Sequence, residues 1–281
     1  MGSPCLAIVA GAGELPINIV KHCIKNNLNY KIIHFEGVEL PWAKDLSVIS
    51  AKFEKPNTLF LSLKDFKCDQ VVFAGSMKRP KLNPLRFDKK FLSIASRLLP
   101  ALKSGDDTTL KIIAEIFEKE GFKIISANQL LKNLFVSEGI LTKLKPNDDD
   151  LIDIKRGLEI LDHISAIDVG QACIVGQGLC LGIETIQGSD ELIKFASLKK
   201  DDYLNNKAGG KGVFLKSQKI NQDTRIDVPT IGINTIQNIA NAGFSGIALK
   251  ANNVQIIDKE VCIELANQLG IFIVSVSNKQ S

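Results

Sequence analysis

An arginine stands between two aspartates in the polar segment that precedes Pro229, at positions 223, 225 and 227. A proline favours an extended backbone for the residue before it and disfavours a helix through the segment. Alternate side chains of an extended chain share one face, so Asp223, Arg225 and Asp227 are expected to project together. Two carboxylates and a guanidinium on one edge can hold Mg²⁺ and a phosphate group. A salt-bridge ladder without a ligand accounts for the same three residues.

A glycine-containing loop follows the first apolar run of the chain. Gly11-Ala12-Gly13 lies between Cys5–Ala10 and an expected helix from Pro16 to about Lys25. Backbone N–H groups and the helix dipole at such a junction can hold a phosphate. The dinucleotide-binding fingerprint requires glycine at position 16, so that fingerprint is incomplete here. Contact with a nucleotide and a plain strand-to-helix turn both remain open.

A second glycine loop, Gly75-Ser76-Met77-Lys78-Arg79-Pro80, follows the expected buried strand Gln70–Ala74. The carboxyl ends of parallel strands meet at one edge of a sheet. Lys78 and Arg79 are therefore expected to face the same cleft mouth as Gly11, where they can clamp a phosphate. Solvated loop charges are the alternative.

Further polar residues stand at the ends of expected elements. Asp106 and Asp107 follow Ser104-Gly105 and either cap a helix or help to hold a hydrated magnesium ion. Additional carboxylates and helix N-termini occur in Asp168-Val169-Gly170-Gln171, in Glu184-Thr185 and in Gly188-Ser189-Asp190. The three histidines lack the spacing of metal ligands and are expected to be structural.

The first half of the chain alternates short apolar runs with amphipathic stretches. The expected strands are Cys5–Ala10, Tyr30–Phe35, Leu46–Ala51, Gln70–Ala74 and Phe122–Ser126. This alternation predicts a parallel sheet covered by helices on both faces, in a Rossmann-like α/β domain.

A polar segment, Lys143–Asp150, contains a proline and a run of aspartates and is expected to be a linker. Beyond it the pattern changes, because Gly176-Gln177-Gly178 between two apolar runs predicts a hairpin. The sequence therefore predicts a Rossmann-like domain at 1–143 and a distinct mixed α/β domain at 144–281.

Composition indicates which classes of protein and which compartment to expect. The 281 residues are 45% hydrophobic and 23% charged, and the formal net charge is +4, which argues against a nucleic-acid binder. The cysteines are scattered in apolar stretches and predict a reducing compartment. With no signal peptide and no apolar run of membrane-spanning length, a cytoplasmic protein is expected.

Taken in chain order, these segments resemble the LpxI family, and the resemblance spans nearly the whole chain. The segments that carry it are Gly11-Ala12-Gly13-Glu14-Leu15-Pro16, Ala74-Gly75-Ser76-Met77-Lys78-Arg79-Pro80, Gly105-Asp106-Asp107, Asp168-Val169-Gly170-Gln171, Glu184-Thr185-Ile186-Gln187-Gly188-Ser189-Asp190 and Gln222-Asp223-Thr224-Arg225-Ile226-Asp227-Val228-Pro229-Thr230-Ile231-Gly232. The last segment is the most specific.

The resemblance implies a magnesium-dependent hydrolase of lipid A biosynthesis. Its reaction would cleave the pyrophosphate bond of UDP-2,3-diacylglucosamine and give UMP and 2,3-diacylglucosamine 1-phosphate. The family fold places the substrate between an N-terminal Rossmann-like domain and a C-terminal domain. A homodimer is implied as well, and the amphiphilic substrate leads us to expect peripheral contact with the inner membrane.

The resemblance also implies roles for individual residues. Asp223 stands where glutamate is common in the family, so Asp227 is expected to carry the main catalytic role. The expected catalytic residues are Asp227, Arg225 and Asp223, and the expected metal ligands are Asp227, Asp223 and Glu184. The expected substrate-binding residues are Gly11, Ala12, Gly13, Lys78, Arg79, Asp168, Gln171, Thr185, Gln187 and Lys216.

Three other functions remain open from the residues alone. The glycine loop at 11–13 would suit an NAD-type oxidoreductase, and nucleotide binding without turnover would suit a regulator. A hydrolase of an unacylated sugar nucleotide would use the same phosphate-binding groups.

Overall fold

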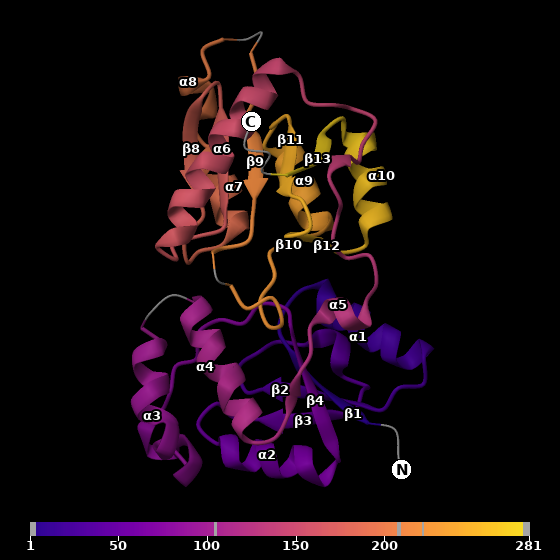
Figure 1. The fold of residues 1–281 in the computed structure, drawn as a ribbon, viewed down its shortest axis with the longest axis vertical. Helices are drawn as coiled ribbons and strands as arrows, with labels where there is room; N and C mark the ends of the chain where they lie inside the picture. The colour runs from indigo at the N-terminus through magenta and orange to yellow at the C-terminus, as the bar shows by residue number, and fades with distance from the viewer. Residues whose placement is uncertain (1–3, 104–105, 207–208, 221, 278–281) are drawn as a thin grey trace. The chain divides into compact units, whose positions relative to one another are not determined.

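The computed structural model describes residues 4–103, 106–206, 209–220 and 222–277 (Figure 1). The chain divides into two compact units, Met1–Lys132 with Asp223–Asp227, and Asn133–Gln222 with Val228–Ser281. The division lies before the expected position at 143/144. The reason is that strand β6, Gly139–Ile140, pairs with strand β13 of the second unit.

The first unit contains a five-stranded sheet in the order β3-β2-β1-β4-β5, and every pair in it is parallel. The strands are β1 (Cys5–Ala10), β2 (Tyr30–Phe35), β3 (Val48–Ala51), β4 (Cys68–Ala74) and β5 (Lys123–Ile124). This order is that of a Rossmann-like sheet, with the change of direction at β1 and β4. The predicted fold of the first domain is confirmed.

Helices cover the sheet of the first unit. They are α1 (Glu14–Lys25), α2 (Pro56–Asp65), α3 (Lys89–Ala101), α4 (Asp106–Lys119) and α5 (Ala127–Leu130), with the short 3₁₀ helices η1 (Pro41–Ala43) and η2 (Pro84–Arg86). Leu63 of α2 and Phe117 of α4 share one core with Val9 and Val71 of the strands. α1 and α5 lie side by side (Figure 1). Apolar strand residues thus meet apolar helix faces, which is the main stabilisation of such a layer.

The second unit contains a six-stranded mixed sheet in the order β6-β13-β11-β9-β7-β8. Its remaining strands are β7 (Ala172–Gly176), β8 (Leu179–Ile183), β9 (Val213–Lys216), β11 (Gly246–Lys250) and β13 (Phe272–Val276), and β10 (Thr230–Ile231) pairs with β12 (Gln255–Ile256). Strands β9, β11 and β13 are parallel, whereas β7 and β8 form the predicted antiparallel hairpin. The prediction of a mixed α/β second domain is confirmed.

The helices of the second unit cover both faces of its sheet. They are α6 (Asp148–Ala166), α7 (Ser189–Ser197), α8 (Lys200–Tyr203), α9 (Ile233–Asn241) and α10 (Lys259–Leu269) (Figure 1). Residues of α7, α9 and α10 share one core with the sheet, and residues of α6 share the core on the other face. α6 begins with a capping box in which Asn147 and Asp150 exchange hydrogen bonds, so the predicted linker leads directly into a well-formed helix.

A buried aspartate fastens the β7–β8 hairpin to α6. The carboxylate of Asp153 accepts hydrogen bonds from the backbone N–H groups of Gly178, at 2.7 Å, and Gln177, at 3.0 Å. Burial raises the pKa of Asp153, and these two hydrogen bonds act in the opposite direction.

None of the described helices is long and apolar enough to cross a membrane.

Candidate functional site

The two predicted glycine loops of the first unit pair with each other. Ala12 donates its backbone N–H to the carbonyl of Ser76 at 2.8 Å, and Ser76 donates back to Ala12 at 3.0 Å. A β-carbon on Gly11 or on Gly75 would collide with the backbone of the opposite loop, so this approach requires glycine. The N–H groups of Gly11 and Ala12 are occupied by Ala74 and Ser76. Gly13, with a φ of 101°, then leads into α1.

The two cations of the second loop have different environments. Arg79 donates from Nη1 to the carbonyl of Leu102 at 2.7 Å, at the end of α3, where carbonyls lack helical partners. Lys78 is exposed and forms no hydrogen bond or ion pair with the residues that the structure describes. Of the two, Lys78 is the cation available to an anionic ligand. The neighbouring Ser104-Gly105 and the side chain of Asp106 lie outside the described residues, and Asp107 pairs with Lys111 at 2.6 Å.

The prediction that residues 223–227 are extended is wrong. The backbone carbonyl of Asp223 accepts hydrogen bonds from the N–H groups of Ile226 and Asp227, both at 3.0 Å, so the segment is a turn. The Asp223 carboxylate also accepts from the N–H of Arg225 at 3.0 Å. An aspartate that binds the backbone two residues later favours a turn. The extended preference that Pro229 imposes applies to Val228, which follows the turn, and so does not extend residues 223–227.

Arg225 nevertheless meets Asp223, together with a partner that sequence analysis missed. Its guanidinium binds the Asp223 carboxylate at 2.7 Å and Glu118 of α4 at 2.6 Å. The hydrogen bond from Arg225 holds the pKa of Asp223 below its usual range. Ile226 packs against the core of the first unit, so this turn is fastened to that unit by charge and by apolar contact. We call Glu118, Asp223 and Arg225 the Arg225 cluster.

In the second unit, strand register brings three predicted site residues to one edge of the sheet. Ala172 of β7 pairs with Lys216 of β9, and Cys173 pairs with Ile183 of β8. Gln171 and Glu184, the residues next to these pairs, consequently lie near Lys216. β7 begins here while β8 and β9 end, so the antiparallel hairpin adds polar residues to the carboxyl end of β9.

A buried chain of hydrogen bonds joins Lys216 to Glu184 through Ser189. Lys216 donates from Nζ to Ser189 Oγ at 2.8 Å, and Ser189 Oγ donates to Glu184 Oε1 at 2.7 Å. Lys216 is 6% exposed and Glu184 is 7% exposed. A buried ammonium is costly unless it is compensated, and Glu184 supplies the opposite charge through the hydroxyl group. We call these three residues the Lys216 cluster.

The backbone fixes Glu184 in this cluster. Its Oε2 accepts the N–H of Gln171 at 3.1 Å. A β-carbon on Gly170 would collide with the carbonyl of Glu184, so glycine allows the two loops to approach. One carboxylate oxygen of Glu184 therefore accepts a hydrogen bond from Ser189, and the other accepts one from the backbone just before β7.

A second polar layer adjoins these residues. Gln171 accepts a hydrogen bond at 3.3 Å from Gln222, which is 6% exposed. Lys219 forms an ion pair with Asp168 at 2.7 Å. Gln222 opens the most specific segment of the family resemblance, so that segment contributes to both units: Gln222 to this layer and 223–227 to the Arg225 cluster.

Sequence analysis placed Lys216, Glu184, Gln171 and Asp168 in the site, and the structure brings these four into one region of the second unit. The contacts of Ser189, Lys219 and Gln222 were not predicted, although Ser189 and Gln222 stand inside the segments that carry the resemblance. Thr185 and Gln187 are exposed in the turn before α7, where the Gln187 N–H approaches Thr185 Oγ1 at 3.5 Å.

The expected magnesium ligands are divided between the two units. Asp223 and Asp227 belong to the first unit and Glu184 to the second. Both oxygens of Asp223 bind Arg225, and both oxygens of Glu184 have the partners described above. Within the described ranges, no three His, Cys, Asp or Glu side chains are gathered as metal ligands require. Within the second unit Glu184 has two hydrogen-bond partners, and its role as a metal ligand stays a prediction.

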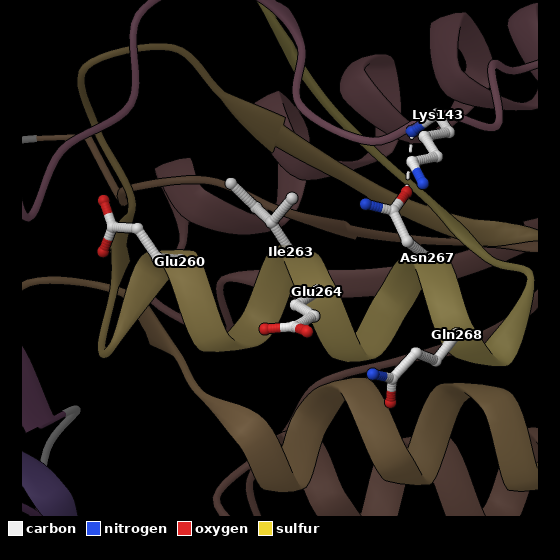
Figure 2. A pocket seen from close by; sticks show the side chains of 6 residues that line it. All are labelled: Lys143, Glu260, Ile263, Glu264, Asn267 and Gln268. Atoms are coloured by element: carbon white, nitrogen blue, oxygen red, sulfur yellow. Dashed lines mark hydrogen bonds between the residues drawn. The ribbon is translucent and has the colours of Figure 1, made fainter.

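A pocket of about 560 Å³ lies elsewhere in the second unit, on the outer side of α10. Figure 2 shows its polar lining and the hydrogen bond from Lys143 to Asn267, at 2.7 Å. The pocket contains none of the predicted site residues. Its lining residues are Lys143, Glu260, Ile263, Glu264, Asn267 and Gln268.

Two solved structures show distant likenesses to this chain. The Bordetella bronchiseptica enzyme WbmG in complex with NAD is 17% identical with a TM-score of 0.28, over 43% of this chain and 36% of that one. N5-carboxyaminoimidazole synthase from Aspergillus clavatus, in complex with ADP and 5-aminoimidazole ribonucleotide, is 12% identical with a TM-score of 0.23, over 71% of this chain and 44% of that one. At these scores neither informs the function.

Sequence comparisons are decisive for the family. The LpxI N-terminal domain matches residues 5–134 and the LpxI C-terminal domain matches residues 137–274. UDP-2,3-diacylglucosamine pyrophosphatase LpxI of Caulobacter vibrioides is 30% identical over 275 residues, which are 98% of this chain and 98% of the relative. The predicted resemblance is thus confirmed over both units, and the chain belongs to the LpxI family.

Proposed function

We propose that this protein is a hydrolase that cleaves the pyrophosphate bond of UDP-2,3-diacylglucosamine and releases UMP and 2,3-diacylglucosamine 1-phosphate for lipid A biosynthesis. The observation that carries the proposal is the match over 98% of both chains to a relative named for this activity. The cytoplasm is the proposed compartment, and a homodimer is the proposed assembly.

The buried Lys216 cluster suits the proposed substrate. A lysine ammonium has three donor hydrogens, and among the described residues Lys216 gives only one of them, to Ser189. The remaining donors can bind a phosphate oxygen, where a fixed positive charge stabilises the charge that develops during hydrolysis. Glu184 and Ser189 act as positioning residues, since they touch Lys216 or its partner and hold the ammonium in place.

The turn at 223–227 supplies the proposed catalytic carboxylate, Asp227. Both oxygens of Asp223 serve Arg225, so we assign Asp223 a positioning role in keeping the turn closed. Arg225 retains a half-exposed guanidinium and is proposed to offset phosphoryl charge. Magnesium, when bound, would polarise the pyrophosphate, and Asp227 is the proposed ligand.

Substrate contacts are proposed in both units. In the first, Lys78 is the cation available for an anionic group, with Gly11, Ala12, Gly13 and Arg79 shaping the loops beside it. In the second, we propose Asp168, Gln171, Thr185 and Gln187 as substrate-binding residues, because they lie in or next to the polar layer around Lys216.

The test is the release of UMP from UDP-2,3-diacylglucosamine in detergent micelles by the purified protein, with Mg²⁺ and with EDTA. The proposal expects release with Mg²⁺ and none with EDTA. UDP-N-acetylglucosamine serves as the unacylated control. Faster hydrolysis of that control would replace the proposed substrate by an unacylated sugar nucleotide, and binding of UDP without any turnover would leave a regulator.

A further inference from the structure

A short segment of the first unit holds the entire excess of positive charge. Residues 78–92 contain six lysines and arginines and one aspartate, whereas the whole chain has 35 basic and 31 acidic residues and a formal net charge of +4. Without these residues the chain would have 29 basic and 30 acidic side chains. The net positive charge of the protein therefore comes from residues 78–92, which we call the basic segment.

The basic segment also exposes the most accessible large apolar side chain among the described residues. Leu85, in the 3₁₀ helix η2, is 96% exposed, and Leu92 near the start of α3 is 61% exposed. Burying either side chain in an apolar environment would be favourable by the ordinary hydrophobic effect. A single exposed leucine is ordinary on a protein surface, so the combination of two exposed leucines with the charge of this segment carries the argument.

The structure holds this apolar tip in place. Asn83 accepts the N–H of Leu85 at 3.1 Å and donates its own N–H to the buried Glu54 at 3.0 Å. Just after the tip, Phe87 stacks on Phe91, with ring centroids 3.9 Å apart. Leu85 thus projects from a fastened loop.

Several cations of the basic segment are available to an external anion. The side chains of Lys81 and Lys89 are exposed and form no hydrogen bond or ion pair with the residues that the structure describes. Within the described part of the chain, the Arg86 guanidinium has one loose ion pair, with Glu36 at 3.6 Å, while Lys90 forms an ion pair with Glu120. The free charges stand on both sides of Leu85 in the sequence.

We propose that the basic segment docks on an anionic lipid bilayer, with Leu85 entering the boundary between headgroups and acyl chains and with Lys81 and Lys89 facing anionic headgroups. Clusters of lysine and arginine beside an exposed apolar residue suit such a surface. A nucleic acid is less well matched, because single strands are bound by exposed aromatic rings and Leu85 is aliphatic. The inference rests on the proposed function to the extent that a diacyl substrate would be met at a membrane.

The experiment is flotation of the full chain with vesicles of neutral phosphatidylcholine and with vesicles that contain one third phosphatidylglycerol, without nucleotide or substrate. We expect binding to the anionic vesicles only. Each lysine near an anionic surface contributes about fivefold to the partition coefficient, so Lys81→Gln with Lys89→Gln should lower it about 25-fold. Leu85→Ser should lower it several-fold at constant charge. The matched controls, Lys119→Gln with Lys132→Gln for charge and Leu61→Ser for an exposed leucine, should leave it within twofold.

Three results would overturn the proposal: no binding of the unmodified protein to anionic vesicles, an equal loss in the control variants, or a loss with the lysine variants and none with Leu85→Ser. The last result would identify a general polyanion surface, and competition by DNA would then distinguish a nucleic acid as its partner. Hydrolysis in detergent micelles is scored separately. Turnover without vesicle binding refutes only this inference, whereas vesicle binding without turnover supports it and refutes the proposed function.

Discussion

The Arg225 cluster and the Lys216 cluster both join basic and acidic side chains from distant parts of the sequence, but they differ in burial. The side chain of Arg225 is 46% exposed, and water screens its ion pairs with Asp223 and Glu118. Lys216 is 6% exposed and reaches Glu184 only through Ser189. The exposed cluster mainly holds a turn in position, whereas the buried cluster compensates a charge whose burial would otherwise be unfavourable.

The largest expected effect lies in the turn of the exposed cluster. Asp227→Asn should lower kcat/KM for UMP release about 1,000-fold, because the proposed catalytic carboxylate is lost while its shape is kept. Thr224→Ala in the same turn should stay within about threefold. An Asp227→Asn protein with activity within tenfold of the unmodified chain would reduce this turn to a structural role.

The second prediction compares the loss of stability when one positive charge is removed from each cluster. Lys216→Met should lower the free energy of unfolding by about 3 kcal/mol in urea titrations, because Glu184 stays buried without an opposite charge. Arg225→Met should lower it by less than about 1 kcal/mol. Adding Glu184→Gln to Lys216→Met should recover part of the stability and none of the activity. Equal losses in the two single variants would erase the distinction between the clusters.

The third prediction tests whether Glu184 positions Lys216 or binds the metal. Glu184→Gln should lower kcat/KM about 10- to 100-fold, since the amide keeps the shape of the Lys216 cluster but not its compensating charge. The concentration of Mg²⁺ that gives half-maximal activity should remain within about twofold of that of the unmodified enzyme. A large rise in that concentration would make Glu184 a metal ligand after all.

The smallest effect is in the pH dependence of stability. Arg225 lowers the pKa of Asp223 in the folded state, so this pair stabilises the protein above the unfolded pKa, about 4, and its contribution is lost as the pH falls through the lowered pKa. The difference in unfolding free energy between the unmodified protein and Arg225→Met should shrink between about pH 5 and pH 2. Lys90 lowers the pKa of Glu120 in both proteins, so the contribution of Glu120 cancels in the difference in unfolding free energy. A difference independent of pH would contradict the assignment.

Local patterns predicted the strands well and the turn at 223–227 poorly. The sheet of the first unit and the β7–β8 hairpin follow from apolar runs and glycine positions that can be read over a few residues. The turn was missed because the extended preference before Pro229, which applies to Val228, was carried over to residues 223–227, where the Asp223 carboxylate binds the Arg225 N–H. β6, with two residues, is too short to leave a pattern, so the boundary between the units was expected too late in the chain.

The contacts of the candidate site could not be predicted either, because they join residues far apart in the sequence. Its residue types could be named because they lie in segments that resemble one family. The partners depend on contacts between residues far apart in sequence, such as Arg225 with Glu118, 107 positions away, and Lys216 with Ser189, 27 positions away. Strand register determines the second contact and helix packing the first, and neither can be read from a single sequence.

The assignment of Asp223–Asp227 to the first unit, while its neighbours on both sides belong to the second, has a consequence for how the gene can be divided. Neither unit is a continuous stretch of polypeptide. A fragment that stops at Lys132 would lack Ile226 from its core and Arg225 beside Glu118. Such a fragment could regain them only from the remainder of the protein supplied as a separate chain. A cut between the two family domains would therefore separate residues 223–227 from the unit in which they pack.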